Sequence, residues 1–262
     1  MIVVFTDLDG TLLDHDSYSF EAAKPALALL KARGIALILA SSKTEAEMRP
    51  LSLALGMDYP LIVENGAGIA NWRNPERGGD DSPSLYQHIR LFLAALPQEL
   101  RGCFAGFGDW SVEKVALATG LSLEAAALAK QRNFSEPGHF TGSDVQRHAF
   151  LALLEVAGFQ AIQGGRFFTV MPRTSKAVRM AELVAFYRRQ SGEAVVSVAL
   201  GDAPNDLAML QAADLGIIIA NPSHTPLPVT ERERQGLILR SEEPGPAGWN
   251  RMIHHLVATG LL

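Results

Sequence analysis

The stretch "FTDLDGTLLD" (Phe5–Asp14) follows the apolar run Ile2–Val4 and places two carboxylates directly after it. A short continuous run of apolar, β-branched residues is typical of a strand that is buried on both faces of a parallel sheet. Asp7 and Asp9 are two residues apart, so their side chains lie on the same side while the chain remains extended. Gly10 would then let the backbone turn away. The stretch therefore predicts acidic groups at the carboxyl end of a buried strand.

Further apolar runs alternate with helical patterns towards both ends of the chain. The strand candidates are Ile2–Asp7, Ile35–Ala40, Pro60–Asn65, Val195–Asp202 and Leu215–Ala220. The helical patterns lie at Glu21–Arg33, Thr44–Leu55, Ser175–Arg189 and Pro204–Ala213. Continuous apolar strands separated by helices indicate a parallel sheet that is covered on both faces. We therefore expect an α/β fold with a doubly wound, Rossmann-like core.

The pattern changes between Asp81 and Pro172, after the Gly/Pro/Asp-rich segment Asn74–Ser84, which is typical of a linker. Helical patterns at Leu85–Leu96, Ser122–Gln131 and Ser143–Ala157 mix here with strand candidates at Cys103–Phe107, Phe159–Gln163 and Phe167–Met171. This mixture predicts an inserted α+β cap domain. We expect residues 1–80 and 173–262 to form the core and residues 81–172 to form the cap.

Composition narrows the classes of partner. Apolar residues make up 48% of the chain and charged residues 19%, which favours a globular protein over a disordered one. The formal net charge of −5 argues against nucleic acid or an anionic membrane as a partner, although a local pocket could bind a small anion. The N-terminus lacks a basic leader and the chain lacks a run of about 18 apolar residues. We expect a cytoplasmic protein, and the pattern gives no signal for an oligomeric state.

The residues that follow each core strand are the first candidates for a site, because ligands of open α/β sheets bind at the carboxyl ends of the strands. The candidates are Asp7, Asp9 and Thr11; Ser41, Ser42 and Lys43; and Asp202, Asn205 and Asp206. Carboxylates that converge at one edge repel one another unless a cation lies among them. An all-oxygen site suits Mg²⁺, completed by water and a phosphate oxygen. The sequence therefore predicts a magnesium site.

Such a site can transfer a phosphoryl group to a carboxylate. One aspartate attacks phosphorus, a second protonates the leaving alcohol and then activates water, and cations neutralise the phosphoryl oxygens. Lys176 opens a core helix and can supply a cation, while Ser41 can supply a hydroxyl donor. Ser41 could instead cap the following helix, a role also open to Ser42 or Thr44. The segment Glu64–Gly66 is either a simple turn or a set of polar groups that face substrate hydroxyls.

Four ordered motifs resemble the haloacid-dehalogenase superfamily of phosphatases. They are "DLDGT" (Asp7–Thr11), "LASSKT" (Leu39–Thr44), Lys176 in "TSKAV" and "GDAPND" (Gly201–Asp206). The position of the insertion resembles the Cof-type branch. The resemblance implies that Asp7 is the nucleophile and Asp9 the acid/base. It also implies that Ser41, Ser42 and Lys176 bind phosphate, that Asp7, Asp9 and Asp202 bind the metal with Asp206 behind them, and that Asn205 orients the phosphate.

Five longer stretches resemble one narrower family, the mannosyl-3-phosphoglycerate phosphatases. They are Ser41–Met48, Pro60–Ile69, Thr119–Pro137, Gly164–Phe168 and Gly245–Asn250. The resemblance implies hydrolysis of 2-O-mannosyl-3-phosphoglycerate to the compatible solute mannosylglycerate through an aspartyl-phosphate. Ala203 and Pro204 depart from the small or Gly-rich pair that is expected between Asp202 and Asn205.

Alternatives to this reading stay open. The substrate could carry a glucosyl group, or the enzyme could be a broader sugar phosphatase or a phosphosugar mutase. A non-catalytic protein that binds phosphorylated ligands is the alternative outside the enzyme class, although a pure binder needs neither a nucleophile nor a second acid.

Three cap residues are candidates for reading the glycerate and the sugar: Arg132, Glu136 and Arg166. Arginine suits a carboxylate because its planar fork pairs with both oxygens. Salt bridges on the surface are an alternative role for the same residues. Glu64 and Asn65 are further candidates for contact with substrate hydroxyls. The stretch "GFGD" (Gly106–Asp109) lacks the spacing of a dinucleotide-binding loop, so we expect no nucleotide cofactor there.

Overall fold

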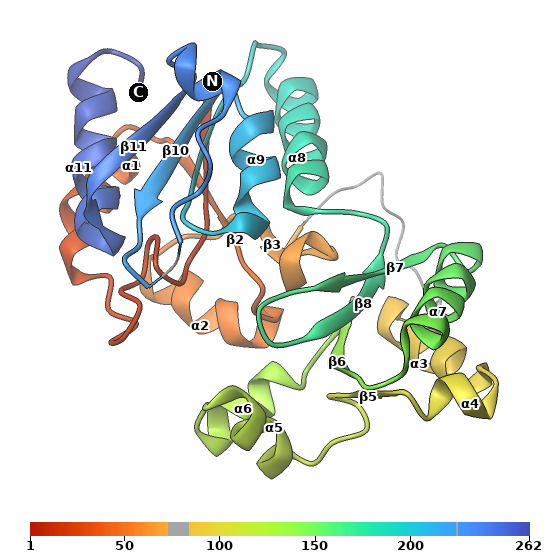
Figure 1. Ribbon diagram of the computed structural model, residues 1–262. Helices are drawn as coiled ribbons and strands as arrows, with labels where there is room; N and C mark the ends of the chain where they lie inside the picture. The colour runs from red at the N-terminus through yellow and green to blue at the C-terminus, as the bar shows by residue number, and fades with distance from the viewer. Residues whose placement is uncertain (73–83, 224) are drawn as a thin grey trace. The chain divides into compact units, whose positions relative to one another are not determined.

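The structure is a computed structural model that describes residues 1–72, 84–223 and 225–262 (Figure 1). It contains two compact units. We call residues 1–41, 52–72 and 175–262 the core unit, and residues 42–51 together with the described residues up to Thr174 the inserted unit. The domain boundaries predicted from the sequence place residues 42–51 in the core, whereas in the structure these residues belong to the inserted unit. The expected boundary at 80/81 and most of the expected linker lie outside the described residues.

The core unit is built on a seven-stranded sheet with the order β11-β10-β9-β1-β2-β3-β4. The strands are β1 (Ile2–Thr6), β2 (Ala36–Ala40), β3 (Leu61–Val63), β4 (Gly68–Ala70), β9 (Val196–Gly201), β10 (Leu215–Ala220) and β11 (Ile238–Pro244). All neighbours pair in parallel except β3 and β4, which are antiparallel. The order runs outward from β1 in two directions, so the topological switch lies between β1 and β9. Ligands bind at such switch points in open α/β sheets.

Helices cover both faces of this sheet (Figure 1). Helices α8 (Lys176–Ser191) and α9 (Leu207–Ala212) lie on one face, and α1 (Lys24–Ala32) and α11 (Gly245–Ala258) lie on the other. The core unit also contains α10 (Glu231–Arg234) and three short 3₁₀ turns at Glu21–Ala23, Glu64–Gly66 and Pro204–Asp206, while α2 (Glu45–Ala54) begins in the inserted unit and ends in the core unit. The expected doubly wound α/β core is confirmed.

The two faces of β1 show why its residues do not alternate between apolar and polar. Val3 and Phe5 pack with Met180 of α8 in one buried cluster. Thr6 points to the opposite face, where its hydroxyl accepts a hydrogen bond from the indole nitrogen of Trp249 at 3.0 Å. A strand at the centre of a parallel sheet has no solvent face, so the alternation of apolar and polar residues disappears.

The inserted unit has its own antiparallel sheet, with the order β5-β6-β8-β7. Its strands are β5 (Phe104–Gly106), β6 (Glu136–Phe140), β7 (Phe159–Gln163) and β8 (Phe168–Pro172). Its helices are α3 (Leu85–Ala95), α4 (Gln98–Arg101), α5 (Val112–Thr119), α6 (Leu123–Ala129) and α7 (Asp144–Val156). Phe104, Phe150 and Phe168 are fully or almost fully buried in its core, and each contributes roughly 1.5–3 kcal/mol through burial.

Local signals explain where these helices begin and end. Ser143 caps α7 through a reciprocal capping box with Gln146, an arrangement that satisfies two backbone donors at once. Helix α5 begins after Ser111, whose hydroxyl accepts from the backbone of Lys114, and ends at Gly120 with a φ of 78°. Only glycine adopts that left-handed conformation at little cost. Among the described residues, no helix is both long and apolar enough to cross a membrane.

Candidate active site

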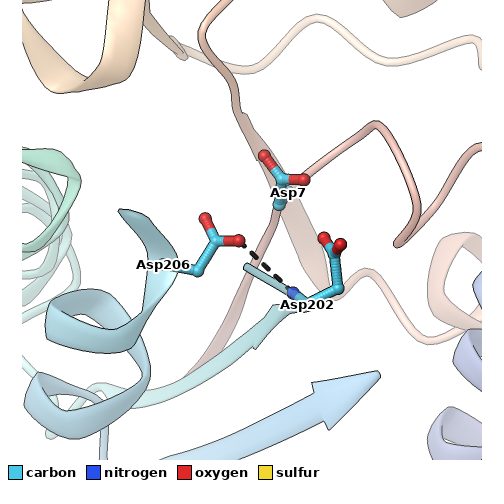
Figure 2. Close-up of side chains that lie close together, drawn as sticks. All are labelled: Asp7, Asp202 and Asp206. Atoms are coloured by element: carbon cyan, nitrogen blue, oxygen red, sulfur yellow. Dashed lines mark hydrogen bonds between the residues drawn. The ribbon is translucent and has the colours of Figure 1, made fainter. Parts of the chain in front are cut away.

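Three aspartates meet at the carboxyl ends of the central strands of the core unit. Asp7 follows β1, Asp202 follows β9, and Asp206 ends the short turn after it. All three are buried, and one carboxylate oxygen from each lies within 4.8 Å of the others. Figure 2 shows the three carboxylates side by side at the strand ends. The structure therefore brings together acidic residues that are almost 200 positions apart in the sequence.

The turn after β9 explains the position of Asp206. Its Oδ2 accepts hydrogen bonds from the backbone nitrogens of Asp202 at 3.3 Å and Ala203 at 3.2 Å. A Cβ atom on Gly201 would lie 2.5 Å from the Cβ of Asp206, so the carboxylate can fold back only over a glycine. The pair Ala203–Pro204, which departs from the family pattern, leaves this turn intact.

Lys176 joins the acidic groups. Its Nζ donates to Oδ1 of Asp7 at 2.6 Å and to Oδ1 of Asp206 at 2.7 Å. The lysine is buried at the start of α8, where the Ser175 hydroxyl caps the helix by accepting from the backbone of Val178. Burial alone would lower the pKa of Lys176, but the charges of Asp206 and Asp7 outweigh burial and raise that pKa. The lysine therefore stays charged, and both oxygens of Asp206 are held by protein donors.

The buried charges do not balance without a further cation. Three carboxylates against one ammonium leave two negative charges in excess. Burial raises the pKa of Asp7 well above its ordinary value, and the charges of Asp206 and Asp202 raise it further, against the opposing effect of Lys176. A divalent cation would remove the excess and lower the pKa of Asp7. The donor set is all oxygen, which fits Mg²⁺.

Asp9 and Thr11 lie in the tight turn after β1. The backbone nitrogen of Gly10 donates to the carbonyl of Leu13 at 2.9 Å, and Asp9 is half-buried in this turn. The hydroxyl of Thr11 donates to Oδ1 of Asp202 at 2.7 Å. The "DLDGT" motif thus supplies Asp7 to the acidic cluster and a hydrogen bond that fixes another member of it.

Ser41 follows β2 directly and is buried. Its backbone nitrogen donates to the carbonyl of Ile62 at 2.9 Å. Thr44, rather than Ser41 or Ser42, caps α2: its hydroxyl accepts from the backbone of Glu47 at 3.2 Å, and the Glu47 carboxylate accepts from the Thr44 backbone at 2.8 Å. The alternative role of Ser41 as a helix cap is therefore excluded by the geometry. Ser42 is exposed, and phosphate binding by both serines stays a prediction.

The turn Glu64–Gly66 has an unusual backbone. Its three residues all have positive φ angles, of 53°, 59° and 83°. A Cβ on Gly66 would lie 2.2 Å from backbone atoms of Ser175 and Lys176, so this turn is pressed against the start of α8. Left-handed conformations of residues other than glycine persist only where their surroundings enforce them.

The side chains of this turn also contact the site. Asn205 Nδ2 donates to Asn65 Oδ1 at 3.1 Å, which ties the loop after β9 to the turn after β3. Glu64 is buried and Asn65 is half-buried. The turn is therefore one wall of the site. Contact of Glu64 or Asn65 with substrate hydroxyls, and of Asn205 with phosphate, stays a prediction.

The three residues predicted in the cap lie in the inserted unit and already have partners there. Arg132 donates to the Ser135 hydroxyl at 2.7 Å. Glu136 is fully buried, and its Oε1 accepts from Arg90 and from the backbone of Gly108, each at 2.8 Å. Arg166 is exposed and donates to the carbonyl of Thr119 at 2.6 Å. Recognition of substrate by these residues stays a prediction.

Sequence reasoning missed two side chains, one that contacts the acidic cluster and one that contacts the turn after β3. Asn221 donates to Oδ2 of Asp202 at 2.7 Å. Arg179 on α8 donates to the carbonyls of Gly66 and Ala67, at 3.3 Å and 3.2 Å. The position of Asn221 as the first residue after β10 is a signal that could have been used, because the same rule selected Asp7 and Asp202.

A model of the haloacid dehalogenase-like hydrolase family matches residues 4–77 and 148–228. The chain belongs to the haloacid dehalogenase-like hydrolases. This membership confirms the superfamily that the four motifs indicated.

Two relatives of this hydrolase resemble it over nearly their whole length. Both are named glucosyl-3-phosphoglycerate/mannosyl-3-phosphoglycerate phosphatase. The protein from Methanococcoides burtonii is 35% identical over 275 aligned residues, which cover 97% of each chain. The protein from Persephonella marina is 34% identical and covers 98% of this chain and 97% of its own.

Solved structures share the fold. A haloacid dehalogenase-like hydrolase from B. subtilis is 18% identical with a TM-score of 0.61, covering 98% of this chain and 100% of its own. A hypothetical protein from Geobacillus kaustophilus is 17% identical with a TM-score of 0.65 and 99% coverage of both chains. At these identities the likeness concerns the fold alone.

Proposed function

We propose that this hydrolase is a Mg²⁺-dependent phosphatase that converts 2-O-mannosyl-3-phosphoglycerate to mannosylglycerate and phosphate. The observation that carries the proposal is the contact of Lys176 with both Asp7 and Asp206 inside a buried cluster of three carboxylates. A lysine that holds a strand-terminal carboxylate beside an acidic cation site is the arrangement that transfer of a phosphoryl group to aspartate requires. The names of the two relatives support the substrate.

Each residue of the site has a role in this proposal. The Asp7 carboxylate attacks phosphorus, the bond from phosphorus to the ester oxygen breaks, and Asp9 gives a proton to the leaving alcohol. Asp9 then takes a proton from a water molecule, which attacks the aspartyl-phosphate and releases phosphate. Lys176 neutralises charge on the phosphoryl oxygens and Ser41 donates a hydrogen bond to them, with Ser42 and Asn205 as further contacts.

The metal would be held by Asp7, Asp9 and Asp202, and Asp206 would support these ligands without binding the metal itself. Mg²⁺ bound there supplies charge neutralisation of the phosphoryl oxygens. Asp206 has one oxygen on Lys176 and the other on two backbone nitrogens. Its three donors make Asp206 the residue that fixes the lysine and the turn of Asp202, which is the supporting role proposed for it.

An activity panel tests the proposal. Phosphate release is measured with Mg²⁺ from mannosyl- and glucosyl-3-phosphoglycerate, 3-phosphoglycerate and hexose 6-phosphates, and kcat/KM is compared. We expect the glycosylated phosphoglycerates to be the best substrates, because they alone present both a sugar and a carboxylate. The glucosyl compound is the second candidate substrate, since the names of both relatives include it.

The other outcomes of the panel separate the alternatives. Higher kcat/KM for hexose 6-phosphates would favour a broader sugar phosphatase, and conversion of one hexose phosphate into its isomer would favour a phosphosugar mutase. Binding of these compounds without phosphate release would favour the non-catalytic alternative. Each of these results would contradict the proposed function.

A further inference from the structure

Asn221 holds one member of the acidic cluster although it lies outside all four sequence motifs of the site. It is the first residue after β10. Its Nδ2 donates to Oδ2 of Asp202 at 2.7 Å, while the hydroxyl of Thr11 donates to Oδ1 of the same carboxylate at 2.7 Å. A donor on each oxygen fixes the plane of the Asp202 carboxylate and still leaves lone pairs on both oxygens.

The orientation of the Asn221 amide follows from its second contact. Its Oδ1 accepts a hydrogen bond from the backbone nitrogen of Ser223 at 2.9 Å. A backbone N–H can only donate, so the oxygen of the amide must face Ser223 and the NH₂ group must face Asp202. The amide therefore acts as a donor to the carboxylate, and an aspartate at the same position could not.

Gly10 in the first motif leaves space for the hydrogen bond between Asn221 and Asp202. Gly10 has a φ of +81°, and a Cβ built on it would lie 2.5 Å from Asn221 Nδ2 and 2.8 Å from Asp202 Oδ2. The backbone of Gly10 thus closes over the bond between the two side chains. Any larger residue at position 10 would have to displace that bond or the turn after β1.

We propose that Asn221 is a positioning residue of the metal site, which holds the Asp202 carboxylate in the orientation that binds Mg²⁺. This inference rests on the metal site of the proposed function. A ligand carboxylate that can rotate must be ordered when the ion binds, whereas one held by two donors is ordered beforehand. Hydrogen-bond partners of metal ligands typically change metal affinity by about 10–100-fold when they are removed.

Calorimetric titration of the metal-free protein with Mg²⁺ tests this role directly. Asn221→Ala should raise the Kd for Mg²⁺ by about 10–100-fold, while kcat at saturating Mg²⁺ changes far less. A matched control is Ser197→Ala. The hydroxyl of Ser197 donates to Oδ2 of Asp214 at 2.7 Å, and Ser197 lies near the start of β9 whereas Asp202 follows its end. The control should keep the Kd of the parent.

The outcomes separate this inference from the function on which it rests. A parent protein that binds no Mg²⁺ would overturn both the proposed metal site and the role of Asn221. A parent that binds Mg²⁺ while folded Asn221→Ala binds it equally well would overturn the role of Asn221 alone. An equal rise of Kd in Ser197→Ala would also overturn it, because the effect would then be a general loss of stability.

A second variant keeps the inference testable if Asn221→Ala does not fold. Asn221→Asp keeps the size of the side chain and its bond from Ser223, but it places a carboxylate oxygen against Asp202. In EDTA its melting temperature should fall below that of the parent, and added Mg²⁺ should raise it by more than it raises that of the parent. A melting temperature equal to that of the parent in EDTA would mean that residues 221 and 202 are not in contact, and would overturn the proposal.

Discussion

At the scale of single residues, Asp7 is the most direct test of the proposed chemistry. Asp7→Asn should lower kcat by at least about 1,000-fold, because an amide cannot form the acyl-phosphate. The variant should nevertheless be at least as stable as the parent in EDTA, since the substitution removes one charge from a buried acidic cluster. Steady-state kinetics measure the loss of kcat, and thermal unfolding in EDTA measures the stability. Turnover within tenfold of the parent would contradict the assignment of Asp7 as the nucleophile.

The raised pKa of Asp7 also predicts a dependence of stability on pH. Burial places its pKa in the folded state above the ordinary value of 3.8. The folded protein then binds a proton more readily than the unfolded chain, so this contribution to stability is fully present below about pH 3.8 and is lost as the pH rises through the raised pKa. Unfolding of the metal-free parent and of Asp7→Asn is compared from pH 4 to pH 8. The parent should lose stability relative to the variant as the pH rises; a constant difference would contradict the prediction.

The ammonium group of Lys176 neutralises part of the negative charge of the acidic cluster. Lys176→Met keeps much of the side-chain volume but leaves Asp7 and Asp206 without their shared donor. Removing one partner of a buried ion pair costs about 3–5 kcal/mol, and Mg²⁺ should recover part of that loss. Urea unfolding with and without Mg²⁺ measures both effects. A variant as stable as the parent in EDTA would show that the lysine does not neutralise the cluster.

Most of the acidic cluster could be predicted because its members come directly after apolar strands, and strand ends of a parallel sheet meet at one edge. The same rule selects the position of Asn221, but neither its contact with Asp202 nor that of Arg179 with the turn after β3 could be predicted, because these contacts depend on which atoms the side chains meet. Glu136 illustrates the same limit in the inserted unit. The sequence makes it a candidate for reading the glycerate and the sugar, and only the structure places its carboxylate in a fully buried position beside Arg90.

At the scale of elements, the turn Glu64–Gly66 links the end of β3 to the start of α8. Gly66→Ala would force a Cβ against the backbone of Ser175 and Lys176, so the substitution should displace the first turn of α8. We expect a loss of activity together with a loss of stability well above 1 kcal/mol. The prediction is checked by kcat/KM and by urea unfolding.

Gly34→Ala is the control for this substitution. Gly34 also has a positive φ, of 64°, but nothing lies within 4 Å of the position of its Cβ. The backbone penalty alone, of about 1 kcal/mol, should appear in its stability, with activity unchanged. If both variants lose equal stability and both remain active, the contact between the turn and α8 has no role in the site.

The sequence pattern does not predict some of the strands, and the composition of these strands explains why. Strand β6 contains Pro137 and Gly138, which are depleted in strands, yet the strand is paired on both sides. A Cβ on Gly138 would lie 2.5 Å from the carbonyl oxygen of Ala105, so the glycine permits close approach of two strands. Strand β11 carries Arg240, Glu242 and Glu243, a composition that suits an edge strand but hides it from a search for apolar runs.

At the scale of the whole molecule, the excess of negative charge predicts dependence on a divalent cation. Chelation should abolish activity and Mg²⁺ should restore it, with Ca²⁺ a poor substitute because its coordination shell is larger and looser. Mg²⁺ at about 100 times its Kd should also add about 2.7 kcal/mol to the free energy of unfolding. Assays after exhaustive chelation, and unfolding over a range of Mg²⁺ concentrations, provide the measurements. Full activity without any divalent ion would contradict the prediction.

The overall α/β architecture could be predicted because apolar strand segments alternate with helical segments along the chain. The strand order, by contrast, needed the structure, since no local signal states which distant strands become neighbours. That β1 pairs with both β2 and β9 decides which strand ends share the site.

The central place of β1 has a consequence for a chain that emerges from a ribosome. One edge of β1 can pair with β2 early, but the other edge waits for β9, which begins at Val196. At about 5–20 residues per second, the wait lasts roughly 10–40 s. During that time an apolar strand presents an open row of backbone donors and acceptors, a template for pairing with other chains. The last third of the chain therefore completes the site and also closes an edge of the nascent protein that could pair with other chains.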